Sequence, residues 1–212
     1  MKFAILDYYH EKNISILNIQ DSFLTKFVIQ DNYALFFYDH KLIMIGCFSE
    51  AKKPLNEILL SQIITTLEFN FKIRKYEINK NAFGLLSSDR RLYIHGKNIG
   101  KNRNLGLGPE VTATAKLTQI QFDQEAVLDF SLSEKHGCAI TQNGSLWFWG
   151  RGYSGETGQN GFSTLDFPKK IENFVTSDIK KVFCNKYASL LLSDHDAQLL
   201  GRVGGASSVA NS

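Results

Sequence analysis

The strongest constraint on the fold is a pattern that occurs four times along the chain. Four segments align without a gap, and each ends on a glycine. They are NYALFFYDHKLIMIG, AFGLLSSDRRLYIHG, HGCAITQNGSLWFWG and YASLLLSDHDAQLLG, ending at Gly46, Gly96, Gly150 and Gly201. The closing glycines are about fifty residues apart, and self-similarity at such a period is the signature of repeat architectures. The sequence therefore predicts an array of similar structural units.

Each segment predicts a β-hairpin. One column of the alignment holds only Asp or Asn, at Asp39, Asp89, Asn143 and Asp194. These residues tolerate positive φ and bond their own backbone, so the column predicts a tight turn, and Asn143-Gly144 is the strongest signal for type I′. The arms after the turn are almost continuously apolar, which is typical of strands covered on both faces.

A second column of the alignment holds only small residues, at Ala34, Gly84, Cys138 and Ser189. Such a column predicts a crowded place where another strand or layer approaches closely.

Glycines continue after the closing glycine in the second and third units. They stand at Gly100, Gly106, Gly108, Gly152, Gly155, Gly158 and Gly161. Neither loop has the Lys-Ser or Lys-Thr ending of a Walker A loop, and no helical pattern follows that would aim a helix N-terminus at a phosphate. We therefore expect these glycines to supply left-handed backbone geometry in a loop that each unit forms again.

Four segments flank or interrupt the repeats. Residues 54–67 have apolar side chains that fit either one face of a helix or further strands, and both alternatives stay open. The apolar runs Lys2 to Leu6 and Ile14 to Ile19 could add strands to an incomplete blade. Residues 204–212 are small and polar, which predicts a flexible tail.

The third unit, HGCAITQNGSLWFWGRGYSGETGQNG, resembles the repeat of the regulator of chromosome condensation family. The residues that carry the resemblance are His136, Asn143-Gly144, Trp149-Gly150, Gly155 and Gly158. It extends over about Phe27 to Gly201 and is weakest in the first unit. It implies an all-β fold, a partial or open β-propeller of about four blades with four-stranded antiparallel sheets, spanning residues 1–203.

The family normally closes a ring of seven blades, whereas this chain contains four central hairpins. An open arc leaves strand edges and apolar faces that must be covered. The N-terminal strands, a second copy of the chain, a larger assembly or a further part of the same protein could cover them.

Composition narrows the class of function. A hydrophobic content of 43% supports a packed core, and 24 basic against 21 acidic residues form no polybasic block, so nucleic-acid binding is not expected. The apolar runs are too short to span a membrane, and the N-terminus has no sustained apolar signal sequence. We expect an intracellular protein, cytoplasmic or cytoskeletal rather than nuclear.

The cysteines and histidines give no metal or disulfide signature. The three cysteines, Cys47, Cys138 and Cys184, include no CxxC pair, and the five histidines are scattered. The sequence therefore predicts no metal and no cofactor, and reduced structural thiols, with Cys138 filling a small apolar slot.

No set of nucleophile, base and orienting group is evident, so we predict no catalytic residues. His136 shares its alignment column with Asn32, Ala82 and Tyr187, which argues against a catalytic role for that column. The expected function is a non-enzymatic interaction or scaffold module that presents propeller loops to other proteins, for which a large assembly is one setting. Candidate contact residues are Lys97, Arg151, Tyr153 and Glu156. The family resemblance also implies an alternative, guanine nucleotide exchange on a Ran-type small GTPase.

Overall fold

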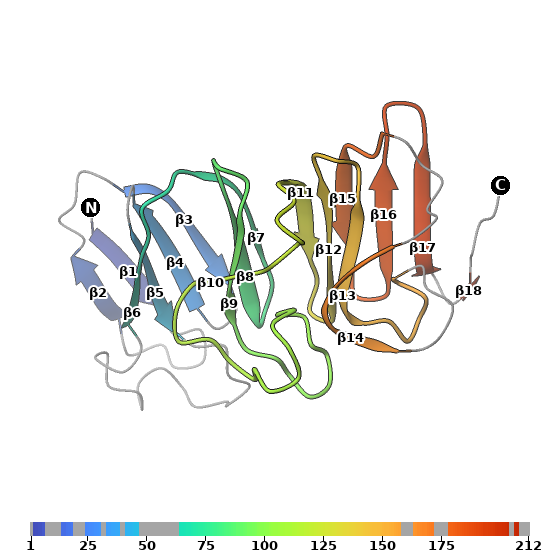
Figure 1. The fold of residues 1–212 in the computed structure, drawn as a ribbon. Coiled ribbons are helices and arrows are strands. Elements are labelled where there is room, and N and C mark those ends of the chain that lie inside the picture. Colours follow the sequence, from blue (N-terminus) through green and yellow to red (C-terminus); the bar gives the residue numbers. More distant parts are fainter. Residues whose placement is uncertain are drawn as a thin grey trace. The chain divides into compact units, whose positions relative to one another are not determined.

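The structure is a computed structural model, and it describes residues 2–6, 14–18, 24–30, 33–38, 41–46, 64–157, 163–171, 178–203 and 206–207. Every regular element within these ranges is a β-strand (Figure 1). The contacts divide the chain into two compact units, Met1–Asn70 and Phe71–Ser212. We describe each unit by itself, and the expectation of one arc over residues 1–203 stays a prediction.

The first unit contains two sheets. Its strands are β1 (Lys2–Leu6), β2 (Ile14–Asn18), β3 (Leu24–Gln30), β4 (Tyr33–Tyr38), β5 (Lys41–Gly46) and β6 (Ile64–Glu68). Strands β3 to β6 form an antiparallel four-stranded sheet in chain order, which we call blade 1. Strands β1 and β2 pair with each other in a separate two-stranded sheet instead of extending this blade.

For residues 54–67 we left open a helix or further strands, and the structure decides between them only for the last four residues. Residues 64–67 lie in strand β6, and Leu67 is buried. Residues 54–63 lie outside the described residues.

The second unit contains three four-stranded antiparallel sheets. Blade 2 consists of β7 (Ile73–Ile78), β8 (Ala82–Ser87), β9 (Leu92–Gly96) and β10 (Thr118–Gln119). Blade 3 consists of β11 (Val127–Leu132), β12 (His136–Thr141), β13 (Leu146–Arg151) and β14 (Thr164–Lys170). Blade 4 consists of β15 (Lys181–Cys184), β16 (Ala188–Leu192), β17 (Ala197–Val203) and β18 (Ala206–Ser207). The predicted all-β fold with four-stranded antiparallel propeller blades is confirmed.

The last strand corrects one expectation. We predicted a flexible tail over residues 204–212, but Ala206 and Ser207 form β18 and pair with Val203 and Arg202 of β17. Alternating antiparallel pairing satisfies their backbone groups, as it does for the fourth strand of the other blades. The other residues of this segment lie outside the described residues.

The three blades of the second unit pack through their faces. Strand β11 contacts both β7 and β15, so the first strands of successive blades lie side by side (Figure 1). Strand β13 shows why its sequence is continuously apolar: Trp147 and Trp149 belong to a core shared with blade 2, whereas Leu146 and Phe148 belong to a core shared with blade 4. Because successive side chains point to opposite faces, both faces of the strand are buried, as predicted.

The hairpins differ in length by one residue, which the ungapped alignment missed. Gly96 and Gly150 pair with Ala82 and His136, whereas Gly201 pairs with Ala188, one place nearer along the chain. Blade 1 has the shorter form too, with Tyr33 opposite its closing glycine. The alignment is therefore correct after the turn and shifted by one residue before it in blades 1 and 4.

This shift changes two columns of the alignment. The structural counterparts of His136 are Tyr33, Ala82 and Ala188, and not Asn32 and Tyr187. Among the small residues, Gly84 is equivalent to Cys138 and Ala34 is equivalent to Ser189, so the column divides into two pairs. The crowding predicted for the column is present at Gly84, because a Cβ on Gly84 would lie 2.7 Å from the Phe130 ring of β11.

The turn itself was predicted in the right place but as the wrong type. In blade 3 the residue with positive φ is Gly144 (78°), whose N–H donates to the Thr141 carbonyl. In blade 2 Arg90 (65°) takes this place and bonds Ser87 in the same way. A single left-handed residue after a turn is typical of longer hairpin loops, whereas type I′ requires two.

Candidate protein-interaction surface

The loop of blade 2 that carries Gly100, Gly106 and Gly108 packs on blade 3, and we call such a contact between a glycine loop and the next blade a clasp. Gly106, with φ of 65°, lies against the Trp149 ring, and a Cβ on it would be 2.7 Å from the ring. On another side of the ring, a Cβ on Gly137 would overlap the ring atoms. The Trp149 indole N–H donates to the Asn104 carbonyl of the same loop at 2.8 Å. These glycines thus allow close packing between blades, as expected of a loop that serves the repeat.

The corresponding loop of blade 3 contacts blade 4. The hydroxyl of Ser189 in β16 donates to the Glu156 carbonyl in the loop at 2.8 Å, and the Nε2 atom of His136 lies 2.8 Å from the same hydroxyl oxygen. The Nδ1 atom of His136 bonds the hydroxyl of Ser133 at 3.1 Å. Both ring nitrogens of this fully buried histidine are therefore used in structural bonds.

The predicted contact residues Lys97 and Arg151 occupy equivalent positions, directly after the closing glycine of their blades. Their backbone N–H groups donate to the carbonyls of Asn81 and Lys135, each at 2.9 Å. Arg202 occupies the same place in blade 4, where it donates to the carbonyl of Tyr187 at 3.0 Å. Three successive blades thus carry a basic residue at one shared position.

Further basic residues lie in the turns that join the first and second strands of these blades. Contacts between blades bring the turns to the same end of the unit: the Asn79 side-chain amide donates to the Ser133 carbonyl at 2.9 Å, and the Lys135 ammonium lies 4.0 Å from the centre of the Tyr187 ring. We define the basic rim as Lys80, Lys97, Lys135, Arg151, Lys186 and Arg202.

The opposite ends of the hairpins carry charges of both signs, including Arg90 and Arg91 beside Asp89. The turns between second and third strands carry Asp89, Asp194 and Asp196, whereas Glu134 is the acidic residue in the turns of the basic rim. The formal charge of the whole chain, +3, does not reveal the recurrence of basic residues at one end of three blades. The sequence signal was the basic residue after three closing glycines, and our sequence analysis missed it by counting charges along the chain.

Exposed aromatic rings lie among these basic groups. Tyr153, a predicted contact residue, is 40% exposed, and the Arg151 guanidinium is 4.9 Å from its ring centre. Tyr187 is 44% exposed, with Lys135 and Lys186 over its ring. Amphipathic rings beside cations are typical of binding surfaces.

Glu156, the fourth predicted contact residue, is not at this surface. Its side chain is fully buried, and its carboxylate accepts the backbone N–H of Ser154 within the loop. The loop folds over this side chain as it docks on blade 4, so we withdraw Glu156 from the contact set.

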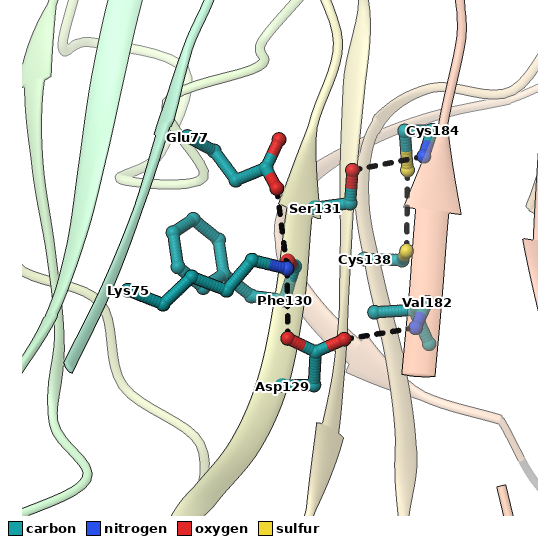
Figure 2. Close-up of polar contacts among 8 residues, drawn as sticks. All are labelled: Lys75, Glu77, Asp129, Phe130, Ser131, Cys138, Val182 and Cys184. Carbon is teal, nitrogen blue, oxygen red and sulfur yellow. Dashed lines mark hydrogen bonds and ion pairs between the residues drawn. The ribbon is translucent and has the colours of Figure 1, made fainter. Parts of the chain in front are cut away.

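A polar network joins the first strands of the three blades (Figure 2). The Asp129 carboxylate of β11 accepts the Lys75 ammonium of β7 at 2.7 Å and the Val182 N–H of β15 at 3.0 Å. Lys75 also donates to the Phe130 carbonyl at 2.7 Å and pairs with Glu77 at 3.1 Å. Asp129 therefore holds one blade to each side.

The electrostatics of this network follow from its half-buried position. Burial tends to lower the pKa of Lys75, but the Asp129 carboxylate outweighs it and the pKa is raised. Burial raises the pKa of Glu77 although Lys75 opposes this. The sequence analysis missed these residues, and the signal that could have found them is that Lys75 and Asp129 occupy the same place in successive units.

The described part of the chain contains neither a metal-binding cluster nor a membrane-spanning helix. Over those ranges, no group of three or more His, Cys, Asp or Glu side chains is placed to hold a metal ion. The same residues include no helix that is long and apolar enough to cross a membrane.

Comparison with known sequences gives partial relatives. No family model matches the chain. It is 38% identical over 110 residues to the E3 ubiquitin-protein ligase HERC2 of Homo sapiens, covering 51% of this chain and 2% of HERC2. It is 33% identical over 88 residues to the ultraviolet-B receptor UVR8 of Arabidopsis thaliana, covering 41% of this chain and 19% of UVR8. The matched segments are thus small parts of both relatives.

Comparison with solved structures gives the same architecture over most of the chain. Human WBSCR16 superposes with a TM-score of 0.71 at 14% identity, covering 95% of this chain and 55% of that one. Prp20p of Saccharomyces cerevisiae superposes with a TM-score of 0.65 at 16% identity, covering 90% and 48%. The chain therefore spans about half the length of these two proteins. Prp20 is yeast RCC1. The repeats and blades of the chain are thus similar to those of yeast RCC1, and the likeness to solved structures gives the propeller fold.

Proposed function

We propose that the chain is a non-enzymatic protein-interaction module whose basic rim binds an acidic segment of a partner protein. The observation that carries the proposal is the recurrence of basic residues at the same end of three successive blades, with the exposed rings of Tyr153 and Tyr187 among them. Complementary charge steers encounter and selects partners, and Arg and Tyr are common among the residues that dominate binding energy.

A protein partner fits this surface better than a nucleic acid. The basic residues of the rim are distributed over three blades. Lys135 is buried and packs over the Tyr187 ring instead of extending toward a phosphate backbone. The similar yeast protein Prp20p is described by its binding to Gsp1p and histones, which supports a role in protein recognition on this fold.

Binding to a defined pair of peptides tests the proposal. The probes are a fluorescent peptide rich in Asp and Glu and its Asn and Gln counterpart, measured by anisotropy at two salt concentrations. We expect the acidic peptide alone to bind, more weakly at high salt, and Arg151→Ala and Tyr153→Ala to reduce its affinity. The control Lys180→Ala removes a basic residue at the opposite end of blade 4 and should have no effect.

The proposal fails if both peptides bind equally or neither binds. It also fails if a 20-base-pair DNA duplex, used as a competitor of about the length of one compact binding site, binds more tightly than the acidic peptide.

A second candidate is nucleotide exchange on a Ran-type GTPase. It is favoured by the likeness of the fold to Prp20p, whose structure is described with its binding to Gsp1p. An exchange factor reshapes the nucleotide site of its GTPase and needs no catalytic triad of its own. Release of a fluorescent GDP analogue from a Ran-type GTPase tests it, because no acceleration at stoichiometric protein removes this candidate.

A further inference from the structure

Two cysteines from neighbouring blades meet beneath the clasp between blades 3 and 4. The Sγ atoms of Cys138 in β12 and Cys184 in β15 are 3.1 Å apart (Figure 2). Both are free thiols; Cys138 is fully buried and Cys184 is partly exposed. They are 46 residues apart in the chain. Their sulfurs lie close together only because the blades pack face to face.

Hydrogen bonds and strand pairing with β11 hold the two thiols in this position. Asp129 and Ser131, on the same face of β11, accept the backbone N–H groups of Val182 and Cys184 at 3.0 and 2.9 Å. Ser131 is also directly opposite Cys138 in the pairing of β11 with β12. Both cysteines are therefore fixed against one residue of β11, and a disulfide bond of about 2.05 Å requires the sulfurs to close by about 1 Å.

We infer that Cys138 and Cys184 form a redox-sensitive pair that closes into a disulfide between blades 3 and 4 when the protein meets a peroxide. This inference does not depend on the proposed binding function. It assigns distinct roles to the two thiols, Cys184 as the one attacked by the oxidant and Cys138 as the resolving one.

The roles follow from access and from local polarity. Cys184 is the partly exposed member, so a small oxidant reaches it first. Burial opposes ionisation of Cys184, but the hydrogen bond from Cys138 and the neighbouring His136 ring hold its pKa well below the usual range. Burial and the hydrogen bond with Cys184 raise the pKa of Cys138. Because the thiolate is the nucleophile, Cys184 reacts first.

The reaction balances with hydrogen peroxide as the oxidant. The Cys184 thiolate attacks one peroxide oxygen, the O–O bond breaks, and the leaving hydroxide takes up the released thiol proton to give water and a sulfenic acid. The Cys138 sulfur then attacks the sulfenic sulfur, the S–O bond breaks, and the Cys138 proton leaves with hydroxide as a second water. Two thiols are oxidised by two electrons, and one peroxide is reduced to two waters.

The disulfide would lie within the contact between blades. The Ser189 hydroxyl, which joins His136 to the Glu156 carbonyl of the clasp, is 3.7 Å from the Cys184 sulfur. Oxidation therefore adds a covalent link at the point where the loop of blade 3, strand β12 and the first strand of blade 4 converge.

Mass spectrometry of the full-length native protein tests the inference. Peroxide treatment should lower the mass by about 2 Da as two hydrogens are lost, and peptide mapping should find Cys138 linked to Cys184. Cys138→Ala should stop the reaction at a Cys184 sulfenic acid that dimedone captures.

Two results would overturn the inference. They are oxidation of both cysteines to sulfinic or sulfonic acids without a link, and faster dimedone capture at Cys138 than at Cys184. Mapping of the wild-type protein decides the question even if the Cys138→Ala variant does not fold.

Discussion

Replacing Gly106 by alanine tests whether the glycine loop is a clasp between blades. The residue has φ of 65°, and its missing Cβ would lie 2.7 and 2.9 Å from two atoms of the Trp149 ring. The ring is blocked on the side of Gly137, and its N–H is bonded to the Asn104 carbonyl. An added methyl group must therefore displace the loop from blade 3.

The chain supplies a matched control in the same loop. Gly100 has φ of 58°, close to that of Gly106, but nothing lies within 4 Å of the position that a Cβ on it would occupy. Alanine in the left-handed region costs about 1 kcal/mol at either site. At Gly106 the overpacking against the ring adds about 1–3 kcal/mol, so Gly106→Ala should cost about 2–4 kcal/mol in total.

Urea unfolding followed by tryptophan fluorescence measures the difference. The two tryptophans of the chain, Trp147 and Trp149, both lie in β13, so the signal reports on blade 3. With a typical slope of about 2 kcal/mol per molar urea, the midpoint of Gly106→Ala should fall about 1 M below that of Gly100→Ala. Equal midpoints for the two variants would refute the clasp.

Three further predictions concern the contacts within and between blades. Asp129→Ala should lower the free energy of unfolding by about 2–3 kcal/mol, because it leaves the Lys75 ammonium and the Val182 N–H without their acceptor; calorimetry showing less than half of this loss for the alanine variant would contradict the assigned role. Glu125 accepts the Thr141 hydroxyl and the Lys170 ammonium, and these bonds outweigh burial and lower the pKa of Glu125 below its ordinary 4.5. Because the folded-state pKa is the lower one, Glu125→Gln should cost about 1–2 kcal/mol at pH 7, and this cost should vanish as the pH falls from 4.5 through the folded-state pKa; a cost that is constant with pH in urea titrations would count against it. The disulfide inferred above closes a loop of 46 residues and should stabilise the oxidised protein by about 4 kcal/mol relative to the reduced one, and scanning calorimetry that finds no rise in melting temperature would argue against a strain-free link.

The blades could be predicted from the sequence because their signals are local. A turn residue, an apolar arm and a closing glycine lie within one hairpin, and each has a direct backbone requirement, as Gly150 shows with its φ of 88°. The unbroken apolar run ending at Trp149 likewise predicted burial on both faces, and the two cores on either side of β13 confirm it.

The one-residue difference between hairpins could not be predicted in this way. Turns of either length place an Asp or Asn before the third strand, so the ungapped alignment satisfied every pattern that was tested. Only the partners of the closing glycines, His136 for Gly150 and Ala188 for Gly201, reveal the shift. The consequence was a wrong set of counterparts for His136.

The candidate surface was harder to predict because residues from several repeats form it together. Arg151 ends strand β13 and is half-buried, and Tyr153 after it is exposed, but Glu156 in the same loop is buried by the docking of that loop. A charge total for the chain also hides the fact that three basic residues recur at one position of the repeat. The cysteine pair was missed for the same reason, since each thiol taken alone looks like an ordinary core residue.

A simple sequence rule nevertheless relates the contact residues of successive repeats. Three polar contacts between the strands of neighbouring blades join residues about one repeat apart. Lys75 and Asp129 are separated by 54 residues, and both Asp129 and Val182 and His136 and Ser189 are separated by 53. Because these separations lie within about two residues of the spacing of the closing glycines, 54 and 51, the residues that hold the strands of neighbouring blades together can be sought close to the counterpart of each position in the next repeat. The residue after each closing glycine follows another logic, since its backbone is fixed by a bond to its own hairpin while its side chain points to solvent in Lys97 and Arg202. Substitution at that position therefore changes the surface without loosening the blade, which is the separation of scaffold from recognition that a binding module requires.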